Sequence, residues 1–495
     1  MPVTAIAAVS QEAGPVPDGS SAMLPLCVDL DGTLVRTDML EEGLLVAVAR
    51  LRLGGLVGAL LAGRAAFKRQ VARAAAFDPA SLPYNEDLLA WLREERAAGR
   101  RLVLATAADE TVAQRIADHL GLFEAVIASD GIRNVKAAVK GAALAERFGA
   151  GGFAYAGNAR SDLAVWQVAG TAVLVDAPAA VVAQVRAERT VERVFATRPP
   201  ALLAMLEAMR PHQWVKNLLV FVPVFTAHAV GDLASWVGGV LAFLAFCATA
   251  SSIYIVNDLL DVQADRAHDR KRLRPFARGA LPLSQGVALA AGLMLLGLAL
   301  AASCGIAVVV GAYLLMSVAY SVHLKEQPLV DVFLLMLLYT IRIFGGGEAT
   351  GHSLSLWLLA FSVFFFLSLA FIKRVEELQR AEAAGRRRVA RRGYTTGDIA
   401  ILQTFGVAAA FISALTLALF VQAEASAQRY AAPLLLWGIV PLLLFWQCRM
   451  WLSVARRYMH HDPIIYAVRD WVSWLTGGVM VLLLYAAKSL VVLAH

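Results

Sequence analysis

Charged residues are scarce in this chain: they make up 17% of its 495 residues, whereas 59% are hydrophobic. That hydrophobic share exceeds the ~45–50% of soluble domains, which excludes an ordinary soluble protein. Cysteine is also rare, and the four cysteines lack metal-ligand spacing, so they indicate buried thiols instead of a zinc site or a disulfide framework. Residues 1–22 lack a basic segment followed by an apolar core, so we expect a disordered start without a signal peptide.

The hydrophobic residues are concentrated in the second half of the chain. Residues 1–210 have an ordinary soluble composition, whereas residues 217–495 consist mostly of apolar runs. Nine candidate spans are present, at 217–231, 235–257, 286–303, 304–323, 328–346, 354–373, 399–422, 431–448 and 474–494. We therefore expect an all-α polytopic membrane domain of about nine transmembrane helices.

Basic residues fall on alternate connections between these spans. If residues 1–216 lie on one side, that side also receives four basic connections, at 258–285, 324–327, 374–398 and 449–473. The opposite loops hold almost no basic residues, with Arg429 as the exception. The positive-inside rule then predicts an integral cytoplasmic (inner) membrane protein with a cytoplasmic N-terminal domain and an external C-terminus. Because these clusters account for the net charge of +7, we expect membrane lipids and no nucleic acid as partners.

An acidic stretch directly follows the apolar run Trp236 to Val256. Its polar residues are Asn257, Asp258, Asp261 and Asp265. The spacing predicts that the three carboxylates share one helix face, where they would repel each other unless a cation lay between them. Mg²⁺ suits such ligands and usually takes substrate phosphates as well. Arg272 and Arg274 follow in a basic run that suits phosphate. The alternative is a solvated acidic loop.

A second charged segment runs from Tyr320 to Asp331, with Arg342 in the next span. Asp331 lies inside an apolar helix, where an unpaired carboxylate is costly. A metal ion or a basic partner such as Lys325 would relieve that cost. The alternative is a helix-end charge that extends to the interface.

A third charged segment begins with Lys373 and Arg374 at the end of a span and continues to Arg386–Arg392. The position of Lys373 and Arg374 favours a role in phosphate binding. The run Arg386–Arg392 has the alternative of a topology signal that contacts anionic lipids.

These residues resemble the UbiA superfamily of intramembrane transferases, over residues 209–495, because the first and second segments match its two Asp-rich motifs. The resemblance implies nine helices around a lipid-accessible cavity, with Mg²⁺ bridging the Asp motifs and a diphosphate. The implied metal ligands are Asp258, Asp261, Asp265 and Asp331. The second motif departs from the pattern of many members, because it is reduced to Asp331 alone.

The segment from Arg210 to Asn217, Arg-Pro-His-Gln-Trp-Val-Lys-Asn, is similar to the entry motif of decaprenyl-phosphate phosphoribosyltransferases. That resemblance implies phosphoribosyl diphosphate as donor and a polyprenyl phosphate as acceptor and nucleophile. The implied substrate-binding residues are Arg210, Lys216, Asn217, Asn257, Arg272, Arg274, Tyr320, Lys325, Arg342, Lys373 and Arg374. An interfacial anchor is the alternative role for Lys216.

The first half of the chain alternates apolar strands with helices. Strands precede Asp29-Leu-Asp31-Gly-Thr, Thr106 and the turn Gly157 to Asp162, and Lys140 opens a helix. This alternation predicts an α/β Rossmann-like domain with a parallel sheet and its site at the carboxyl ends of the strands.

The same four elements resemble haloacid dehalogenase-like hydrolases. The resemblance implies that Asp29 is a phosphate-attacking nucleophile and Asp31 a general acid and base. The other implied roles are phosphate binding by Thr106 and Lys140 and Mg²⁺ binding by Asp29, Asp31 (through its carbonyl) and Asp162. Asn158 stands where a further Asp is common, which puts the rate in doubt. The alternative is a degenerate domain kept as a scaffold.

The expected domains are 23–195 for the phosphatase, with a cap insertion at about 38–90, and 209–495 for the transferase. The cap contains an apolar helix at 43–62, interrupted by Arg50 and Arg52, that suits the membrane surface. A linker at 196–208 contains a Pro pair.

Together these features predict a bifunctional Mg²⁺-dependent enzyme. The membrane half would transfer 5-phosphoribose to a polyprenyl phosphate, and the first half would remove the 5-phosphate from the product. One alternative is transfer of a polyprenyl group from its diphosphate to an aromatic or other small acceptor. Another is a non-enzymatic lipid-binding membrane protein with a regulatory soluble domain.

Overall fold

The computed structural model describes residues 23–49, 56–61, 63–74, 77–130, 132, 134–389, 392–423, 430–459 and 462–489. Outside the described residues lie the segment 1–22, which was predicted to be disordered, and the residues Arg50, Arg52 and Arg429. The chain divides into two compact units, unit 1 up to Arg198 and unit 2 from Pro199.

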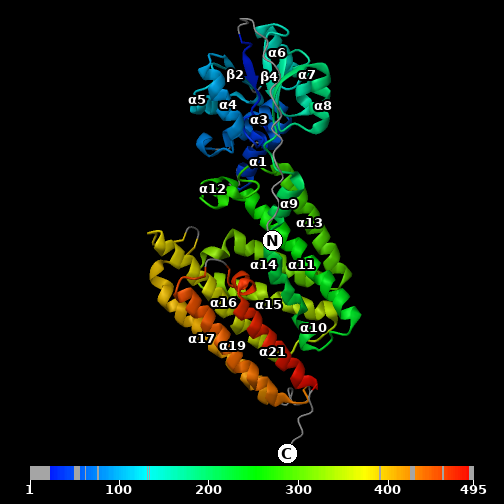
Figure 1. Ribbon diagram of the computed structural model, residues 1–495, viewed down its shortest axis with the longest axis vertical. Coiled ribbons are helices and arrows are strands. Elements are labelled where there is room, and N and C mark those ends of the chain that lie inside the picture. Colours follow the sequence, from blue (N-terminus) through cyan, green and yellow to red (C-terminus); the bar gives the residue numbers. More distant parts are fainter. Residues whose placement is uncertain are drawn as a thin grey trace, which may run out of the picture. The chain divides into compact units, whose positions relative to one another are not determined.

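Unit 1 is built on a six-stranded parallel sheet (Figure 1). Its strands are β1 Leu26–Val28, β2 Leu102–Asp109, β3 Ala125–Ser129, β4 Ala154–Gly157, β5 Thr171–Val175 and β6 Thr190–Phe195. Their order is β3-β2-β1-β4-β5-β6, and every neighbouring pair is parallel. The predicted α/β Rossmann-like fold is therefore confirmed. The strand order reverses between β1 and β4, where open parallel sheets bind ligands at their carboxyl ends.

Helices cover both faces of this sheet. They are α4 Glu86–Ala97, α5 Glu110–Leu120, α6 Ala138–Phe148, α7 Leu163–Trp166 and α8 Ala179–Glu188, and α1 Met39–Ala49, α2 Leu56–Leu61 and α3 Arg64–Ala74 precede them in the chain. Leu26 and Val28 of β1 pack with α4 and α5, whereas Cys27 packs on the opposite face with α6, α7 and α8. Because successive side chains of a strand point to opposite faces, β1 contributes to the hydrophobic core on each side of the sheet.

The insertion between β1 and β2 is shorter than the predicted cap at 38–90. Helices α1, α2 and α3 form it, whereas α4 returns to the sheet because Leu88 and Leu92 are buried in its core.

Unit 2 is an all-α unit (Figure 1). Its helices are α9 Ala201–Met209, α10 Val222–Thr226, α11 Leu233–Leu260, α12 Val262–Arg266, α13 Leu283–Ser303, α14 Ala307–Val322, α15 Val330–Thr350, α16 Leu356–Ala383, α17 Ile399–Gln422, α19 Ile439–Ala455, α20 Pro463–Arg469 and α21 Trp471–Ser489. Within the described residues, 7 helices are long and apolar enough to cross a membrane, and α14 is a shorter apolar helix. These eight correspond to eight of the nine predicted spans.

The remaining predicted span, 217–231, is not one continuous helix. Residues Pro211–Phe221 form the 3-10 helix η3, which is followed by the five-residue α10. Pro223 removes a backbone donor near the start of α10. Close packing also fixes this segment, because a Cβ on Gly346 of α15 would lie 2.0 Å from the Val220 carbonyl oxygen.

Replacing Gly346 with Ala tests this close approach. The added methyl group would force η3 away from α15, and we expect a loss of stability of about 1–3 kcal/mol, as for other overpacked sites. Gly292 of α13 is the matched control, because a methyl group added there would meet no neighbouring atom within 4 Å. The melting temperature of the detergent-solubilised protein should fall for Gly346→Ala and hold for Gly292→Ala. Equal melting temperatures would contradict the close contact.

Candidate functional site

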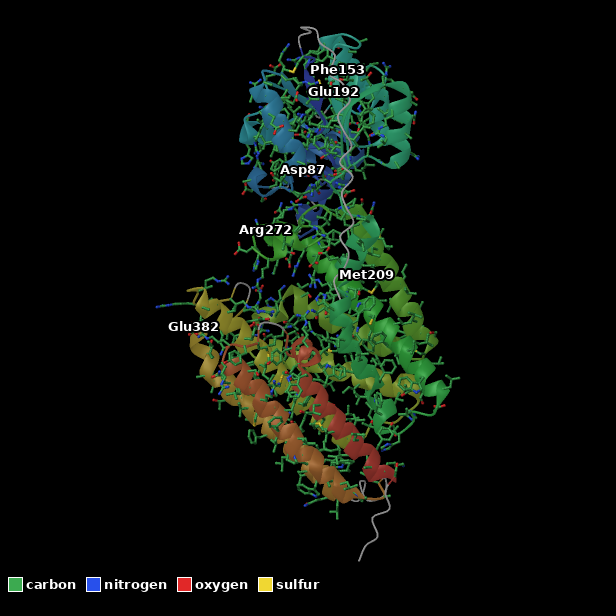
Figure 2. All side chains as sticks on the ribbon, in the orientation of Figure 1. Asp87, Phe153, Glu192, Met209, Arg272 and Glu382 are labelled. Carbon is green, nitrogen blue, oxygen red and sulfur yellow. The ribbon has the colours of Figure 1, made fainter. Side chains whose placement is uncertain are left out.

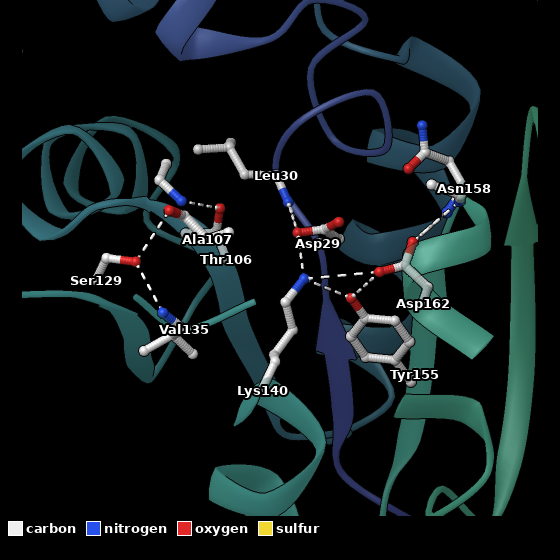
Figure 3. Close-up of polar contacts among 12 residues, drawn as sticks. Asp29, Leu30, Thr106, Ala107, Ser129, Val135, Lys140, Tyr155, Asn158 and Asp162 are labelled. Atoms are coloured by element: carbon white, nitrogen blue, oxygen red, sulfur yellow. Dashed lines mark hydrogen bonds and ion pairs between the residues drawn. The ribbon is translucent and has the colours of Figure 1, made fainter. Parts of the chain in front are cut away.

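The predicted catalytic residues of unit 1 meet at the carboxyl end of β1 (Figure 3). Lys140 donates to Asp29 Oδ1 over 2.8 Å, and its Nζ lies 3.8 Å from Asp162 Oδ1. Lys140 also donates to the Tyr155 hydroxyl, which in turn donates to Asp162. Three predicted residues are thus brought together. Tyr155 was missed, although its place in the strand just before Gly157 could have indicated it.

Burial shifts the acidity of both carboxyl groups that follow β1. Burial raises the pKa of Asp29 to about 6, against the lowering effect of Lys140. Burial, followed by the nearby charge of Asp38, raises the pKa of Asp31 to about 8. Asp31 Oδ1 accepts a hydrogen bond from the Met39 N–H, at the start of α1. A carboxyl group that keeps its proton at neutral pH suits a general acid.

Thr106 lies in β2, and Asp162 ends the short 3-10 helix after β4. The Thr106 hydroxyl accepts a hydrogen bond from the Ala108 N–H at the end of β2. Asp162 Oδ2 accepts from the N–H groups of Asn158 and Ala159, so its metal role stays a prediction. The Asn158 side chain lies against Gly32, where a Cβ would come within 2.2 Å of the amide nitrogen. Only glycine fits there, since its φ is also +75°.

In unit 2 the first acidic motif is held by two arginines. Arg274 Nη1 lies 2.9 Å from Asp258 Oδ1 and 2.6 Å from Asp265 Oδ2. Arg210 donates to both oxygens of Asp258 and stacks on Tyr254. The buried carboxylates of Asp258 and Asp265 therefore both contact Nη1 of Arg274. A positive charge is needed there, because two carboxylates so close together would otherwise repel each other.

The expected shared helix face is corrected by the structure. Helix α11 ends at Leu260, and Asp261 lies in the turn before α12. Asp258 and Asp265 share Arg274 as an ion-pair partner. Within the described residues, no group of three or more His, Cys, Asp or Glu side chains is placed to hold a metal ion. A Mg²⁺ ion at Asp258 and Asp265 would therefore complete its shell with phosphate and water oxygens, as it commonly does.

Asp331 has a basic partner, but it is Arg374 and not Lys325. The two side chains are fully buried and 2.5 Å apart. The Tyr394 hydroxyl also donates to Asp331, and Arg374 pairs with Glu377. The metal role of Asp331 stays a prediction, because this observed pair already meets the need for a counter-charge.

Other predicted substrate-binding residues lie in separate polar networks. Arg342 donates to Asn217 over 2.7 Å and to the Tyr313 hydroxyl over 3.1 Å. Asn257 donates to Ser321. Arg392 donates to the Tyr320 hydroxyl and to the Lys325 carbonyl. Arg272 is exposed (Figure 2).

Two predicted lysines meet at a carboxylate that sequence reasoning missed. Asp462 Oδ2 lies 2.6 Å from Lys216 Nζ and 3.6 Å from Lys373 Nζ. An apolar groove of about 980 Å³ is lined by residues from the same segments. Its lining includes Val215 and Leu219, which flank Lys216 in the sequence, and Pro463 and Ile464, which follow Asp462. The segments that carry Lys216 and Asp462 thus also contribute to an apolar groove.

Comparison with known proteins relates this chain to a membrane enzyme family. Residues 218–474 match the UbiA prenyltransferase family. An uncharacterized protein, y4nM, from Sinorhizobium fredii is 37% identical over 92% of this chain and 90% of its own length. A decaprenyl-phosphate phosphoribosyltransferase from Corynebacterium glutamicum is 36% identical over 44% of this chain and 68% of its own length.

Solved structures resemble each unit at lower identity. A UbiA homolog from Archaeoglobus fulgidus bound to GPP and Mg²⁺ covers 58% of this chain and 100% of its own, at 17% identity and a TM-score of 0.45. A HAD family hydrolase from Salmonella enterica serovar Typhi covers 35% of this chain and 69% of its own, at 16% identity and a TM-score of 0.26.

Replacing Asp331 with Leu separates a structural role from a metal role. Loss of the carboxylate leaves Arg374 buried without this partner, and breaking such a pair costs about 3–5 kcal/mol. We expect a large fall in melting temperature, substantially restored in the double variant Asp331→Leu/Arg374→Met. Glu382→Gln is the control, since its ion pair with Arg457 is about half exposed on both sides. An unchanged melting temperature, with loss of Mg²⁺-dependent stabilisation, would favour a metal ligand instead.

Proposed function

Because the chain belongs to the UbiA prenyltransferase family, we propose that unit 2 transfers 5-phosphoribose from phosphoribosyl diphosphate to a polyprenyl phosphate. The observation that carries this proposal is the presence of two charged sites and an apolar groove. The acidic site suits a Mg²⁺-bound diphosphate, and the lysine site suits a lipid phosphate. The name of the relative from Corynebacterium glutamicum supports this choice of substrates.

The acceptor is proposed to bind with its phosphate at Lys216 and Lys373 and its chain in the apolar groove. The groove offers apolar surface from Val215 and Leu219, which lie next to the first lysine in the sequence of η3. A lipid phosphate already carries the charge of a nucleophile, so the enzyme must position it more than activate it. A buried cationic site beside an apolar groove meets both needs.

The donor diphosphate is proposed to bind at Asp258 and Asp265, with Asp261 as a further ligand on the adjoining turn. Mg²⁺, when bound there, would neutralise charge that develops on the departing diphosphate. Arg210 and Arg274 already contact these carboxylates, and a guanidinium can bind phosphate oxygens in pairs. We propose that both arginines bind the diphosphate as it leaves.

Unit 1 is proposed to remove the 5-phosphate from the lipid product. Asp29 would attack phosphorus, Asp31 would protonate the leaving oxygen, and Thr106 and Lys140 would bind the phosphate. The proximity of Lys140 to Asp29 supports this, as does the raised pKa of Asp31. Mg²⁺ at Asp29, the Asp31 carbonyl and Asp162 would reduce repulsion between nucleophile and phosphate.

Both activities are proposed to lie on the cytoplasmic side of the inner membrane. The basic connections at 258–285, 324–327, 374–398 and 449–473 support this orientation.

Incubating the purified protein with labelled phosphoribosyl diphosphate, polyprenyl phosphate and Mg²⁺ should give a labelled lipid. Asp258→Asn should lower that turnover by about 10²–10³-fold, because it removes one anchor of transition-state charge. Mass spectrometry of the extracted lipid identifies the product. No labelled lipid, together with prenylation of an aromatic acceptor from a polyprenyl diphosphate, would favour the alternative function.

Asp29→Asn tests the second activity independently of the first. A neutral amide cannot replace the nucleophile, so the variant should still form the phosphoribosyl lipid but accumulate it with the 5-phosphate attached. The ratio of phosphorylated to dephosphorylated lipid is the readout, and Asp118→Asn, at an exposed position of α5, is the control. The same ratio in parent and Asp29→Asn would contradict a sequential phosphatase.

A further inference from the structure

The lysine site of unit 2 joins three segments that are far apart in the chain. Lys216 lies in η3, Lys373 in α16, and Asp462 caps the first turn of α20 by accepting from the Ile464 N–H. Both lysines contact the same oxygen, Asp462 Oδ2. Two positive charges therefore share one negative charge.

The three charged side chains are largely buried, so little water is available to neutralise their charges. The side chains of Lys216 and Asp462 are each 9% exposed, and that of Lys373 is 24% exposed. Burial raises the pKa of Asp462, but Lys216 and Lys373 outweigh that effect and lower the pKa to about 2. The carboxylate therefore stays charged at neutral pH, and any anion that binds the lysines must compete with it.

We infer that Asp462 sets the charge that a ligand must bring, so that this site accepts a phosphomonoester and releases a phosphodiester. A phosphomonoester carries about −1.5 to −2 charges near pH 7, enough to neutralise both lysines once Asp462 is displaced. A phosphodiester carries a single negative charge and offers no more than Asp462 does. Because Asp462 is part of the chain, it is always present at high effective concentration and displaces the diester.

The inference rests on the proposed function for the identity of its ligands. In that reaction an oxygen of the lipid phosphate forms a bond to C1 of the ribose, and the bond from C1 to the diphosphate oxygen breaks. The diphosphate leaves with the bonding electrons. The lipid phosphate thereby changes from monoester to diester and loses one negative charge, so the step itself converts the ligand that the site holds into one that it rejects.

The test measures binding of two lipids to the full-length protein in detergent at pH 8. The probes are geranylgeranyl phosphate and its methyl ester, a monoester and a diester with the same chain. The parent should bind the monoester about tenfold more tightly or better. Asp462→Asn keeps an N-cap side chain. Because it removes a competitor of every anion, it should tighten the binding of both probes by about tenfold, the value of one charge-assisted hydrogen bond. The diester should then bind the variant about as tightly as the monoester binds the parent.

Asp470→Asn is the matched control, because Asp470 follows the same short helix and pairs with Arg449 instead. It should keep the parent's affinity for both probes. Asp462→Ser, which also retains a capping oxygen, is a second variant with the same expected result as Asp462→Asn. The stoichiometry of binding gives the folded fraction of each variant, so partial unfolding does not alter the measured affinities. Unchanged affinity for the diester in both Asp462 variants would overturn the inference.

The outcomes also separate this inference from the proposed function. If the parent binds neither probe better than neutral geranylgeraniol, the proposed acceptor and the inference both fail. If the affinity for the diester depends on Asp462 but no phosphoribosyl transfer occurs, the inference is supported and the proposed donor fails.

Discussion

Neutralisation of buried charge is the constraint on which the membrane unit depends. Asp331 and Arg374 lie fully buried within an apolar bundle, and each would be costly without the other. Their pairing joins α15 to α16, the helix that also carries Lys373. Asp258 and Asp265 meet the same constraint through Arg274. Each ion pair therefore ties together particular segments, α15 to α16 and the end of α11 to the basic run after α12, within packing that is otherwise apolar.

Both units place a lysine against a carboxylate at the proposed phosphate site. Lys140 contacts Asp29 in unit 1, and Lys216 contacts Asp462 in unit 2. In each case the carboxylate holds the lysine in position before a phosphate is present. The carboxylates differ in role, because Asp29 is the proposed nucleophile whereas Asp462 competes with the ligand. The same ion pair can thus serve covalent chemistry in one unit and selection by charge in the other.

Features that depend on a few neighbouring residues could be predicted from the sequence, whereas most contacts between distant residues could not. The strand before Asp29 and its loop were recognisable because the pattern lies within a few residues, and parallel strands bring Lys140 to the same sheet edge. The partner of Asp331 was sought nearby, at Lys325, but Arg374 lies on the next helix. Asp462 is 246 residues from Lys216, and no spacing rule links them. The break at Asp261 was also missed, because helical spacing assumes a continuous helix.

The charge of the lipid supplies a physical reason for combining the two proposed activities in one chain. Transfer leaves a diester beside the polyprenyl chain and a monoester at the 5-position of the ribose. Reversal would need diphosphate to attack the same phosphoribosyl lipid. Hydrolysis of the 5-phosphate removes that lipid, and the diester that remains lacks the charge to compete with Asp462. The phosphatase and the lysine site would then favour the same direction, one by consuming the product and the other by weakening its binding.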